Sequence, residues 1–369
     1  MKSSDLFFCI KSLENVGGAE RVLVDLANGF VDRGKVVTVL SYDEPEVKSF
    51  YELDSRVEWL PLGIGSTSKS AKLIETLERI RALRRVITKR RPGVVIGFMH
   101  SMFIPLGLAL LATPIPLIAS EHIVPEHYKS RPLEKILLYL VPLFAKRITC
   151  VSKQVRSSYS PFLQRKMVSV VNPVNIDACG QAAVSGQQRP RKILLTVGRL
   201  APQKDHVTLL EAFAQIADHL PTWDLRIVGD GELRQELESK VAELGLGERV
   251  FLPGSIKDIA AEYLAAQLFV QPSRYESFGL TTAEALAHGL PAVGFNDCKG
   301  TNQLIIPGVN GDLADGYGDR VTSLAHTLKA LMADDTLRVS LSRRTGDTLN
   351  DYQLENVLNC WETIISEVT

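Results

Sequence analysis

The sequence lacks the features that would point to the secretory pathway or to a membrane-spanning protein. Its five cysteines form no Cys-x-x-Cys pair and have neither zinc-site nor disulfide spacing, which fits a reducing cytoplasm. The apolar segment 6–10 is too short for the core of a signal peptide. The most apolar stretch, 93–120, contains His100 and three prolines, so it predicts a strand, a helix and a second strand rather than a membrane span.

The chain also lacks a net charge, because 42 lysine and arginine residues balance 42 aspartate and glutamate residues. This balance gives no reason to expect nucleic acid as a partner. The charge is nevertheless divided unevenly. Residues 1–172 carry 25 basic and 16 acidic side chains, whereas the rest of the chain carries 17 and 26. The basic first half is therefore expected to meet an anionic partner.

Short apolar runs alternate with segments of helical periodicity, which is typical of an α/β protein with parallel sheets. The length of 369 residues suggests two domains, and the series of strands restarts near residue 192. The expected strands are 6–10, 36–40, 94–98, 117–120 and 148–151, followed by 192–197, 225–228, 250–252, 268–271 and 292–294.

The division between the two series is expected at 173–190, whose Gly, Ala, Ser, Gln and Pro content is that of a linker. We therefore predict two doubly wound, Rossmann-like domains at 1–172 and 191–349. A C-terminal helix within 350–369 is expected to pack back on the first of them. In doubly wound folds ligands bind at the carboxyl ends of the strands, and two facing domains would place both sets of strand ends across one cleft.

Two cations follow the first strand of the second series. Strand 192–197 leads into Gly198, and Arg199 and Lys204 lie in the loop behind it. At the carboxyl end of a strand, a planar guanidinium and a compact ammonium suit a pyrophosphate. The alternative interpretation is a pair of solvated loop charges.

A second motif follows the strand 268–271, where residues 276–284 read Glu-Ser-Phe-Gly-Leu-Thr-Thr-Ala-Glu. Gly279 permits close approach of a ligand to the backbone, and the N–H groups that open the next helix make an anion site. Carboxylates repel phosphate but accept hydroxyl protons, so Glu276 is assigned to a sugar and Glu284 to a ribose diol. The alternative, acidic residues favoured near a helix N-terminus, explains Glu284 alone.

At these motifs the sequence resembles a known family. Arg199 and Lys204, followed by two glutamates eight residues apart, are similar to the signature of the retaining glycosyltransferases of the GT-B fold, family 4. The resemblance covers nearly the whole chain and includes Gly17-Gly18-Ala19-Glu20-Arg21, Val151-Ser152, Asn172-Pro173-Val174-Asn175 and Gly229-Asp230-Gly231-Glu232-Leu233. Together with Ile118-Ala119-Ser120-Glu121-His122, the Gly-Gly motif resembles enzymes that extend lipid-linked oligosaccharides, such as the N-acetylgalactosamine transferases of bacterial N-glycosylation.

The resemblance implies transfer with retention of configuration from a UDP-sugar, which is a substrate and not a cofactor. Uridine is expected from the resemblance alone. The implied catalytic residues are His122, Arg199, Lys204 and Glu276, although a histidine behind a strand is often structural. The implied donor-binding residues are Gly17, Gly18, Gly198, Gly229, Gly254, Ser277, Phe278, Gly279, Leu280 and Glu284.

No Asp-x-Asp motif is present anywhere in the chain. Metal-dependent nucleotide-sugar enzymes hold Mg²⁺ or Mn²⁺ on carboxylates beside the pyrophosphate, so we expect neither a metal nor a cofactor. Arg199, Lys204 and the helix N-terminus would then stabilise the departing nucleoside diphosphate. A double displacement would need a carboxylate nucleophile, for which Glu121 is the nearest but a disfavoured candidate.

The acceptor is expected on the first domain. Segment 69–91 carries nine basic and two acidic residues, and forms either a solvated helix face or a surface for anionic lipid or diphosphate. Segment 129–147, apolar with basic ends, is either core or dips into a membrane interface. The expected contacts with the acceptor or the membrane are Arg84, Arg85, Arg90, Arg91, Arg131 and Lys135.

The sequence thus predicts an enzyme that transfers a hexose or N-acetylhexosamine to a polyprenyl-diphosphate-linked oligosaccharide, in glycan, O-antigen or capsule assembly. It would be cytoplasmic and peripheral on the inner face of the cell membrane. A soluble sugar or polysaccharide acceptor is the alternative. A Rossmann oxidoreductase would need Gly-x-Gly-x-x-Gly, which Gly17-Gly18-Ala19 does not provide, and an inactive subunit is disfavoured by the complete Arg/Lys/Glu/Glu set.

Overall fold

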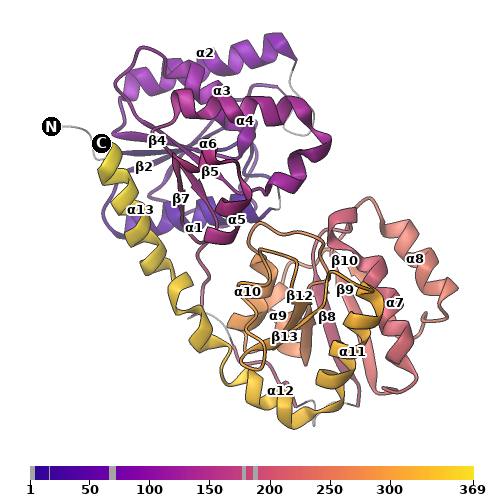
Figure 1. The fold of residues 1–369 in the computed structure, drawn as a ribbon. Coiled ribbons are helices and arrows are strands. Elements are labelled where there is room, and N and C mark those ends of the chain that lie inside the picture. Colours follow the sequence, from indigo (N-terminus) through magenta and orange to yellow (C-terminus); the bar gives the residue numbers. More distant parts are fainter. Residues whose placement is uncertain (1–4, 16, 66–71, 177–179, 186–189) are drawn as a thin grey trace. The chain divides into compact units, whose positions relative to one another are not determined.

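The computed structural model describes residues 5–15, 17–65, 72–176, 180–185 and 190–369 (Figure 1). The chain forms two compact units, each with its own parallel sheet. Unit 1 comprises residues 1–173 together with 354–369, and unit 2 comprises residues 174–353. The expected α/β class with two Rossmann-like domains is confirmed, and each unit is described below by itself.

Unit 1 contains a seven-stranded parallel sheet with the order β3-β2-β1-β4-β5-β6-β7 within its described residues. Its strands are β1 (Leu6–Cys9), β2 (Val37–Ser41), β3 (Glu58–Pro61), β4 (Val94–Phe98), β5 (Leu117–Glu121), β6 (Arg147–Cys150) and β7 (Met167–Ser169). The central strands are buried along their whole length, because helices cover both faces of the sheet.

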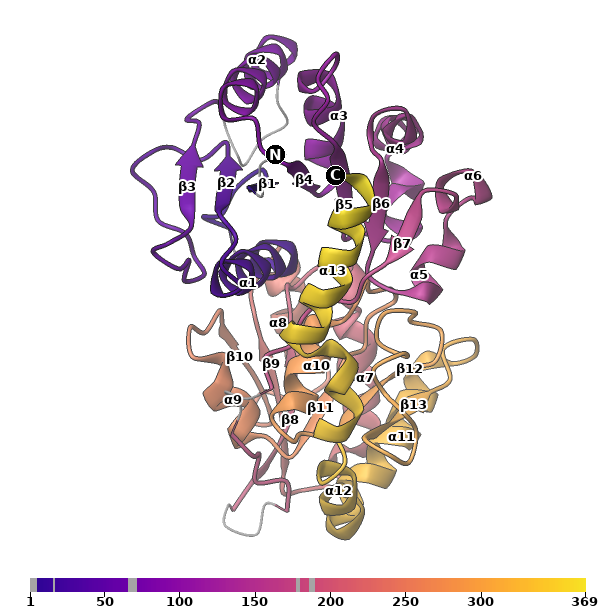
Figure 2. The same ribbon diagram turned by 90° about the vertical axis from the view of Figure 1, so that its left-hand side faces the viewer.

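The helices of unit 1 form two layers (Figure 2). They are α1 (Gly18–Asp32), α2 (Leu73–Arg90), α3 (His100–Ala109), η1 (Pro125–Ser130), α4 (Pro132–Phe144), α5 (Lys153–Ser158), α6 (Pro161–Gln164) and α13 (Leu354–Val368). Helices α2, α3 and α4 pack side by side on one face of the sheet, while α1 and α13 lie on the other.

Helix α13 belongs to unit 1 although it ends the chain. Its apolar residues Val357, Leu358, Trp361 and Ile364 recur at helical spacing and are buried in the core of unit 1. They pack against α1, where Gly29 makes room for Leu358: a Cβ on this glycine would lie 2.8 Å from Leu358 Cδ1. The C-terminal segment therefore completes the first sheet's cover.

Unit 2 contains a six-stranded parallel sheet with the order β10-β9-β8-β11-β12-β13 within its described residues. Its strands are β8 (Lys192–Val197), β9 (Trp223–Val228), β10 (Val250–Gly254), β11 (Leu268–Val270), β12 (Ala292–Phe295) and β13 (Gly311–Ala314). Its helices are η2 (Pro202–Lys204), α7 (His206–Ala217), α8 (Arg234–Glu243), α9 (Ile259–Ala265), α10 (Leu280–Ala287), α11 (Arg320–Ala333), α12 (Asp335–Ser342) and η3 (Gly346–Tyr352). Apolar side chains of β8, β9 and β11 meet those of α7 and α11 in the core.

The segment 173–190, expected as a linker, packs on unit 2 in its described part. The backbone N–H of Ala182 donates to the carbonyl of His288 (2.7 Å), and the side chains of Ala182 and Val184 are buried. Arg338 Nε donates to the carbonyl of Val184 (3.3 Å). The composition predicted a linker, and in its described part alanine and valine bury apolar surface against unit 2.

Among the described residues, no helix is both long enough and apolar enough to cross a membrane.

Gly229, directly behind β9, is required by the close approach of two loops. Its φ is +139°, a region open essentially to glycine alone, and a Cβ there would lie 2.0 Å from the carbonyl oxygen of Gly198. We predict that Gly229→Ala lowers the free energy of unfolding by on the order of 3 kcal/mol or more, measured by urea denaturation.

The matched control is Gly34→Ala, because Gly34 also has a positive φ, of +74°, but has no neighbouring atom within 4 Å of an added Cβ. It should cost only about 1 kcal/mol. Equal losses in the two variants would contradict a role for the contact between Gly229 and Gly198.

Candidate functional site

The carboxyl edge of the second sheet is built from glycine backbone. Gly198, Gly229 and Gly254 lie at or directly behind the ends of β8, β9 and β10. The N–H of Gly198 donates to the carbonyl of Val228, and the N–H of Gly229 donates to the carbonyl of Gly254, both at 2.9 Å. Three of the expected donor-binding glycines therefore lie side by side. Gly198 and Gly229 are half-buried, whereas Gly254 is buried, so at most the first two leave backbone that a ligand could approach closely.

The loop behind β8 presents the two expected cations differently. Arg199 is exposed, and no described residue supplies an ion pair for it. Lys204, which ends η2, is partly buried beside the start of α7. The next residue, Asp205, has a φ of +52° and forms ion pairs with Arg274 (3.2 Å) and Arg320 (3.5 Å), which fix the end of the loop.

Lys204 and Glu276 form an ion pair that joins the two sequence motifs. Lys204 Nζ lies 2.5 Å from Glu276 Oε1, and only 13% and 11% of the two side chains is exposed. Ser273 Oγ (2.7 Å) and Gln271 Nε2 (3.2 Å) also donate to Oε1. Within the described residues no donor contacts Oε2, so this oxygen is left to accept a hydrogen bond from a ligand.

The helix α10 opens with the motif predicted to bind an anion. Gly279, its N-cap, has a φ of +89°, which turns the chain into the helix. The first N–H groups to find a carbonyl are those of Thr282 and Ala283, which both donate to Gly279, so the N–H groups of Leu280 and Thr281 precede the helical bonds. The expected donor-binding residues Ser277 and Phe278 immediately precede this turn. Phe278 is buried against Tyr352, and this contact anchors the turn.

Glu284 lies inside the same helix, away from Lys204. Its side chain is buried, and Oε2 accepts a hydrogen bond from the hydroxyl of Tyr263 (2.8 Å). Tyr263 in turn packs on His288, with ring centroids 5.0 Å apart. The two glutamates of the motif therefore have different environments: Glu276 contacts a cation, whereas Glu284 contacts a phenol. Sequence spacing distinguished their positions but not these partners.

In unit 1, His122 follows β5 in a setting that keeps it neutral. Burial lowers its pKa to about 4. Its Nε2 lies 2.9 Å from Ser120 Oγ, which accepts a hydrogen bond from the hydroxyl of Thr149 (3.0 Å), and its ring stacks on Phe98. The other ring nitrogen, Nδ1, is buried and has no hydrogen-bond partner among the described residues.

Glu121, next to His122, is held inside unit 1. Its Oε2 accepts from the hydroxyl of Tyr128 (2.7 Å), and its Oε1 accepts from the backbone N–H of Ile123 (3.0 Å). Only 1% of the residue is exposed, and this burial raises its pKa to about 7. A nucleophile needs an accessible and ionised carboxylate, so this environment gives no support to a double displacement through Glu121.

The Gly-Gly motif of unit 1 lies at the start of α1. Gly17 is the N-cap with extended backbone, and Gly18 is the first residue of the helix. A Cβ on Gly17 would meet only the flexible carboxylate of Glu20, at 2.2 Å. Packing within the protein therefore does not explain glycine at this position. The expected role of Gly17 in binding a ligand stays a proposal.

A cluster near the carboxyl ends of β4 and β5 joins Arg131, expected as an acceptor contact, to His100, His127 and Glu134, which the sequence did not single out as site residues. His100 begins α3, and its Nε2 lies 3.3 Å from Glu134 Oε2, while Arg131 Nη1 lies 3.2 Å from Glu134 Oε1. His127 Nε2 is 3.8 Å from the same carboxylate. Burial is the main factor that lowers the pKa of both histidines. His100 just behind a strand was the available signal, but its partners come from η1 and α4, much further along the chain.

The basic residues expected on the acceptor side do not act as one patch. Arg84 donates to the carbonyls of Ala109 and Leu111 (both 2.8 Å), which end the neighbouring helix, and Arg90 pairs with Glu58 (2.7 Å). Arg85 and Arg91 are exposed, as is Lys135. Arg131 pairs with Glu134 in the cluster described above. Residues 69–71 of the expected basic segment lie outside the described residues.

Among the described residues, no three His, Cys, Asp or Glu side chains are grouped so as to hold a metal ion.

Fold and site together define a class of protein. Two parallel α/β units, a basic loop behind the first strand of the second sheet, and a paired-glutamate motif that opens α10 are the features of a GT-B glycosyltransferase. Residues 16–178 match the family described as Glycosyltransferase Family 4, and residues 181–347 match Glycosyl transferases group 1. The chain therefore belongs to the family 4 glycosyltransferases, as the motifs predicted.

The relatives that match along nearly the whole chain include two bacterial glycosyltransferases. One is the alpha-1,4-N-acetyl-D-galactosaminyltransferase of Campylobacter jejuni that acts on GalNAc-alpha-(1->4)-GalNAc-alpha-(1->3)-diNAcBac-PP-undecaprenol. It is 27% identical over 98% of both chains. The other is an amylovoran biosynthesis glycosyltransferase of Erwinia amylovora, 26% identical over 98% of this chain and 99% of the relative.

Solved structures share the fold. Sucrose-phosphate synthase of Thermosynechococcus elongatus superposes with a TM-score of 0.85 at 19% identity, over 99% of both chains. The Anabaena protein HepE, solved with UDP and glucose, gives a TM-score of 0.78 at 20% identity, over 98% of this chain and 99% of that one.

Glu121 should make the stability of unit 1 depend on pH. Its pKa is raised from 4.5 to about 7 in the folded protein, so its contribution is fully present below pH 4.5 and is lost as the pH rises through 7. Glu121→Gln has no such ionisation. We predict that this variant gains on the order of 3 kcal/mol relative to wild type between pH 4.5 and pH 8.

Thermal and urea unfolding across this pH range would measure the gain. Glu248→Gln, at an exposed position of unit 2, is the control and should follow the wild type. A stability difference between Glu121→Gln and wild type that does not change with pH would contradict the assignment.

Proposed function

We propose that this glycosyltransferase moves a hexose or N-acetylhexosamine from a UDP-sugar, with retention and without a metal, to a polyprenyl-diphosphate-linked oligosaccharide. The observation that carries the donor half of the proposal is the Lys204–Glu276 ion pair beside the N-terminus of α10. The ion pair brings together an ammonium group, which can bind phosphate, and a carboxylate, which can bind sugar hydroxyls, at one edge of the sheet. The crystal complexes of HepE with UDP and with UDP-glucose support the choice of nucleotide.

The pyrophosphate of the donor would be held by Arg199, Lys204 and the first N–H groups of α10. Arg199 is exposed and can close on a phosphate without breaking an ion pair with a described residue. The N–H groups of Leu280 and Thr281 add the positive end of the helix dipole. These contacts would stabilise the negative charge that grows on the leaving diphosphate, which is the task a metal performs in other enzymes.

The sugar moieties would be held by carboxylates. Glu276 binds Lys204, Ser273 and Gln271 through Oε1, so Oε2 can accept protons from hydroxyls of the transferred sugar. Glu284 would accept from the ribose diol, with Tyr263 fixing its orientation. His122, which burial keeps neutral, would form a hydrogen bond with the sugar through Nδ1, which has no partner among the described residues. Gly17 and Gly18 would let the backbone at the start of α1 approach the substrate.

The configuration is retained because the diphosphate leaves, and the acceptor hydroxyl attacks, on the same face of the sugar. The bond between the anomeric carbon and the phosphate oxygen breaks first, and the sugar becomes oxocarbenium-like. The acceptor hydroxyl attacks from the side that the diphosphate leaves, and the leaving phosphate oxygen takes the hydroxyl proton. This route needs no carboxylate nucleophile, in agreement with the buried setting of Glu121.

A lipid-linked acceptor is supported by two observations. The Campylobacter jejuni relative, which matches along the whole chain, acts on an undecaprenyl-diphosphate glycan. The segment 1–172 also carries 25 basic but only 16 acidic side chains. Because the proposed pyrophosphate ligands lie in unit 2, this basic excess has another use, and an anionic lipid at the cytoplasmic face of the membrane fits it. A soluble sugar or polysaccharide acceptor is the second candidate.

The two cations should serve the transition state and the nucleotide. We predict that Arg199→Ala and Lys204→Ala each lower kcat at least about 100-fold, because each faces charge that grows as the diphosphate leaves. Lys204→Ala should also weaken binding of free UDP in calorimetry, whereas Glu276→Gln should lower kcat but leave UDP affinity within about twofold.

Lys329→Ala, at an exposed position on α11, is the control for loss of a positive charge in the same unit. Full activity of a folded Arg199→Ala or Lys204→Ala enzyme would overturn the assignment. Weaker UDP binding in Glu276→Gln than in Lys204→Ala would reverse the assigned roles.

The complete proposal is tested by assaying a panel of UDP-sugars with a lipid-linked and a soluble acceptor, with and without excess EDTA. We expect transfer to the undecaprenyl-diphosphate glycan to persist in EDTA, since Arg199, Lys204 and the helix N-terminus replace the metal. Strict dependence on Mg²⁺ or Mn²⁺ would refute the metal-free mechanism. Preference for the soluble acceptor would refute the lipid-linked one and leave the donor assignment standing.

A further inference from the structure

We infer that unit 1 inserts the outer face of α4 into the surface of an anionic bilayer. The residues of this surface, called the α4 face below, are Leu133, Ile136, Tyr139, Leu140 and Leu143 of α4 together with Phe162 of α6. The inference deepens the proposed function, since a membrane-bound acceptor gives the face its purpose. It rests on the apolar surface of the protein rather than on the site for the donor.

The α4 face is apolar but turned to solvent. Leu133, Ile136 and Leu143 are 67%, 60% and 73% exposed. The opposite side of the same helix is buried through Leu138 and Val141. A helix at the surface of a soluble protein normally has a polar outer face, so apolar residues on both sides mark the outer one as an interaction surface.

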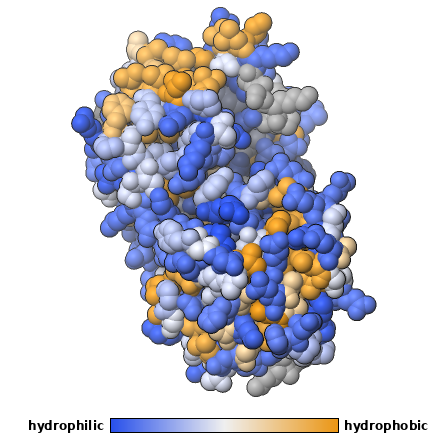
Figure 3. All heavy atoms as spheres, turned by 45° about the vertical axis from the view of Figure 1, so that its right-hand side comes forward, coloured by the Kyte–Doolittle hydropathy of each residue, from blue (hydrophilic) through white to orange (hydrophobic). Residues whose placement is uncertain are grey.

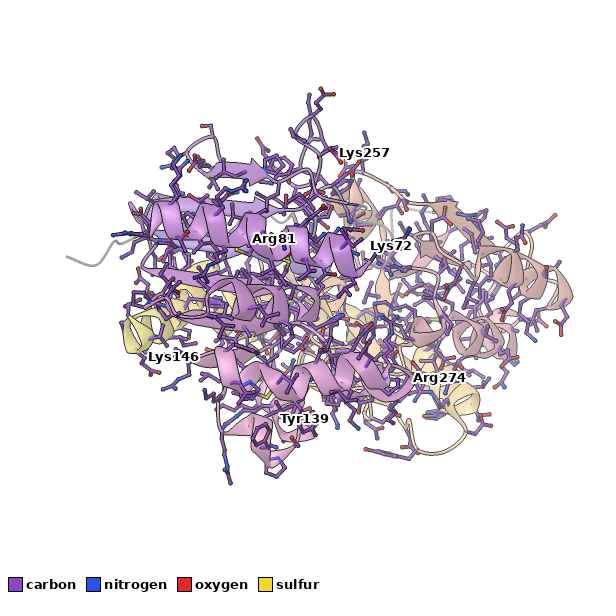
Figure 4. All side chains as sticks on the ribbon, turned by 90° about the horizontal axis from the view of Figure 1, so that it is seen from above. Lys72, Arg81, Tyr139, Lys146, Lys257 and Arg274 are labelled. Carbon is purple, nitrogen blue, oxygen red and sulfur yellow. The ribbon has the colours of Figure 1, made fainter. Side chains whose placement is uncertain are left out.

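An aromatic pair extends the α4 face beyond a single helix. Tyr139 stacks on Phe162, with ring centroids 6.1 Å apart and planes 3° from parallel. Figure 4 shows Tyr139 on the outer side of α4 and Lys146 beyond its C-terminal end. A tyrosine presents an apolar ring with a polar hydroxyl, which suits the boundary between headgroups and acyl chains.

Neighbouring helices add further exposed apolar side chains. Helix α3, which packs between α2 and α4, contributes Leu108, the turn behind it contributes Leu111, and the start of α2 contributes Leu73 and Ile74. Figure 3 shows hydrophobic side chains gathered over the surface of unit 1. These residues add exposed apolar side chains to the helical layer that contains α4.

The charges around the α4 face favour an anionic lipid. Residues 127–166 contain nine lysines and arginines but one acidic residue, Glu134. Glu134 already forms an ion pair with Arg131 (3.2 Å). The exposed cations include Lys129, Lys135, Lys146 and Arg165. An apolar helix face bordered by cations is the pattern of helices that lie in the membrane interface.

A second copy of the chain fits this surface poorly. Two α4 faces in contact would bring two basic borders together, and the one acidic residue of the segment is already paired with Arg131. A bilayer with anionic headgroups covers the apolar residues and neutralises the borders at the same time. The surface also differs from the basic helix expected at 69–91, because Arg84 and Arg90 there are engaged within unit 1.

The test is binding of the purified full chain to vesicles, without donor or acceptor. Vesicles that mix phosphatidylcholine with phosphatidylglycerol should bind the wild type, and vesicles of phosphatidylcholine alone should bind it less well. Part of the binding should survive high salt, because the inserted apolar residues are not screened. We expect the double variant Ile136→Ser/Leu143→Ser to lower the partition coefficient at least about tenfold.

The matched control is Ile306→Ser/Tyr317→Ser, which removes two exposed apolar side chains from unit 2 and should bind as the wild type does. Circular dichroism and UDP binding confirm that both double variants fold. In Tyr139→Trp, brominated acyl chains should quench fluorescence relative to the same vesicles without bromine, with the wild-type tryptophans as reference.

The inference is overturned if the wild type ignores anionic vesicles or if Ile136→Ser/Leu143→Ser binds them unchanged. It is also overturned if sedimentation velocity shows a dimer that this double variant abolishes, since a second copy would then cover the face. Because no sugar transfer is measured, failure here leaves the donor and acceptor proposals intact. Vesicle binding in an enzyme that prefers soluble acceptors would in turn reject only the proposed acceptor.

Discussion

The parallel pairing of β8 with β11 is the constraint on which the candidate donor site depends. Leu194 pairs with Leu268, so the loops behind these two strands emerge side by side, although they are distant in the chain. The strand order reverses here, with β9 and β10 on one side of β8 and β11 to β13 on the other. At such a switch point the chain leaves the two neighbouring strands in different directions, which opens a crevice between their loops. The Lys204–Glu276 ion pair connects the loops behind β8 and β11 at this place.

The sequence was sufficient for the class of fold and for the positions of the site motifs. Buried parallel strands are nearly continuous apolar runs, so β1, β4, β5 and β8 were all expected near their observed places. The strands β3, β7 and β13 were missed because they lie at or near sheet edges, are short, and contain polar or half-exposed residues. Their pairing comes from neighbouring strands rather than from a local pattern.

The contact partners of the site residues could not be predicted from the sequence, for a different reason. That Glu276 would bind Lys204, and that Tyr263 would bind Glu284, depends on contacts between segments distant in the chain. The same limit applies to the basic residues of α2. Nothing local distinguishes Arg84, which binds the end of α3, from the exposed Arg85 beside it. Hydropathy likewise allowed 129–147 to be core or interface, and only the packing of α4 separates its two faces.

Charge acts at two ranges in this protein. The second half of the chain has more acidic than basic residues, so its overall field repels an anionic nucleotide-sugar. In the proposed function, binding would therefore depend on short-range contacts from Arg199, Lys204 and the helix N-terminus, which salt screens little when they are desolvated. The first half has the opposite balance, yet its histidines at the sheet edge have lowered pKa values and add little charge. Its positive field therefore comes from exposed lysines and arginines, and a spread surface charge of this kind attracts an extended anionic surface better than a single phosphate.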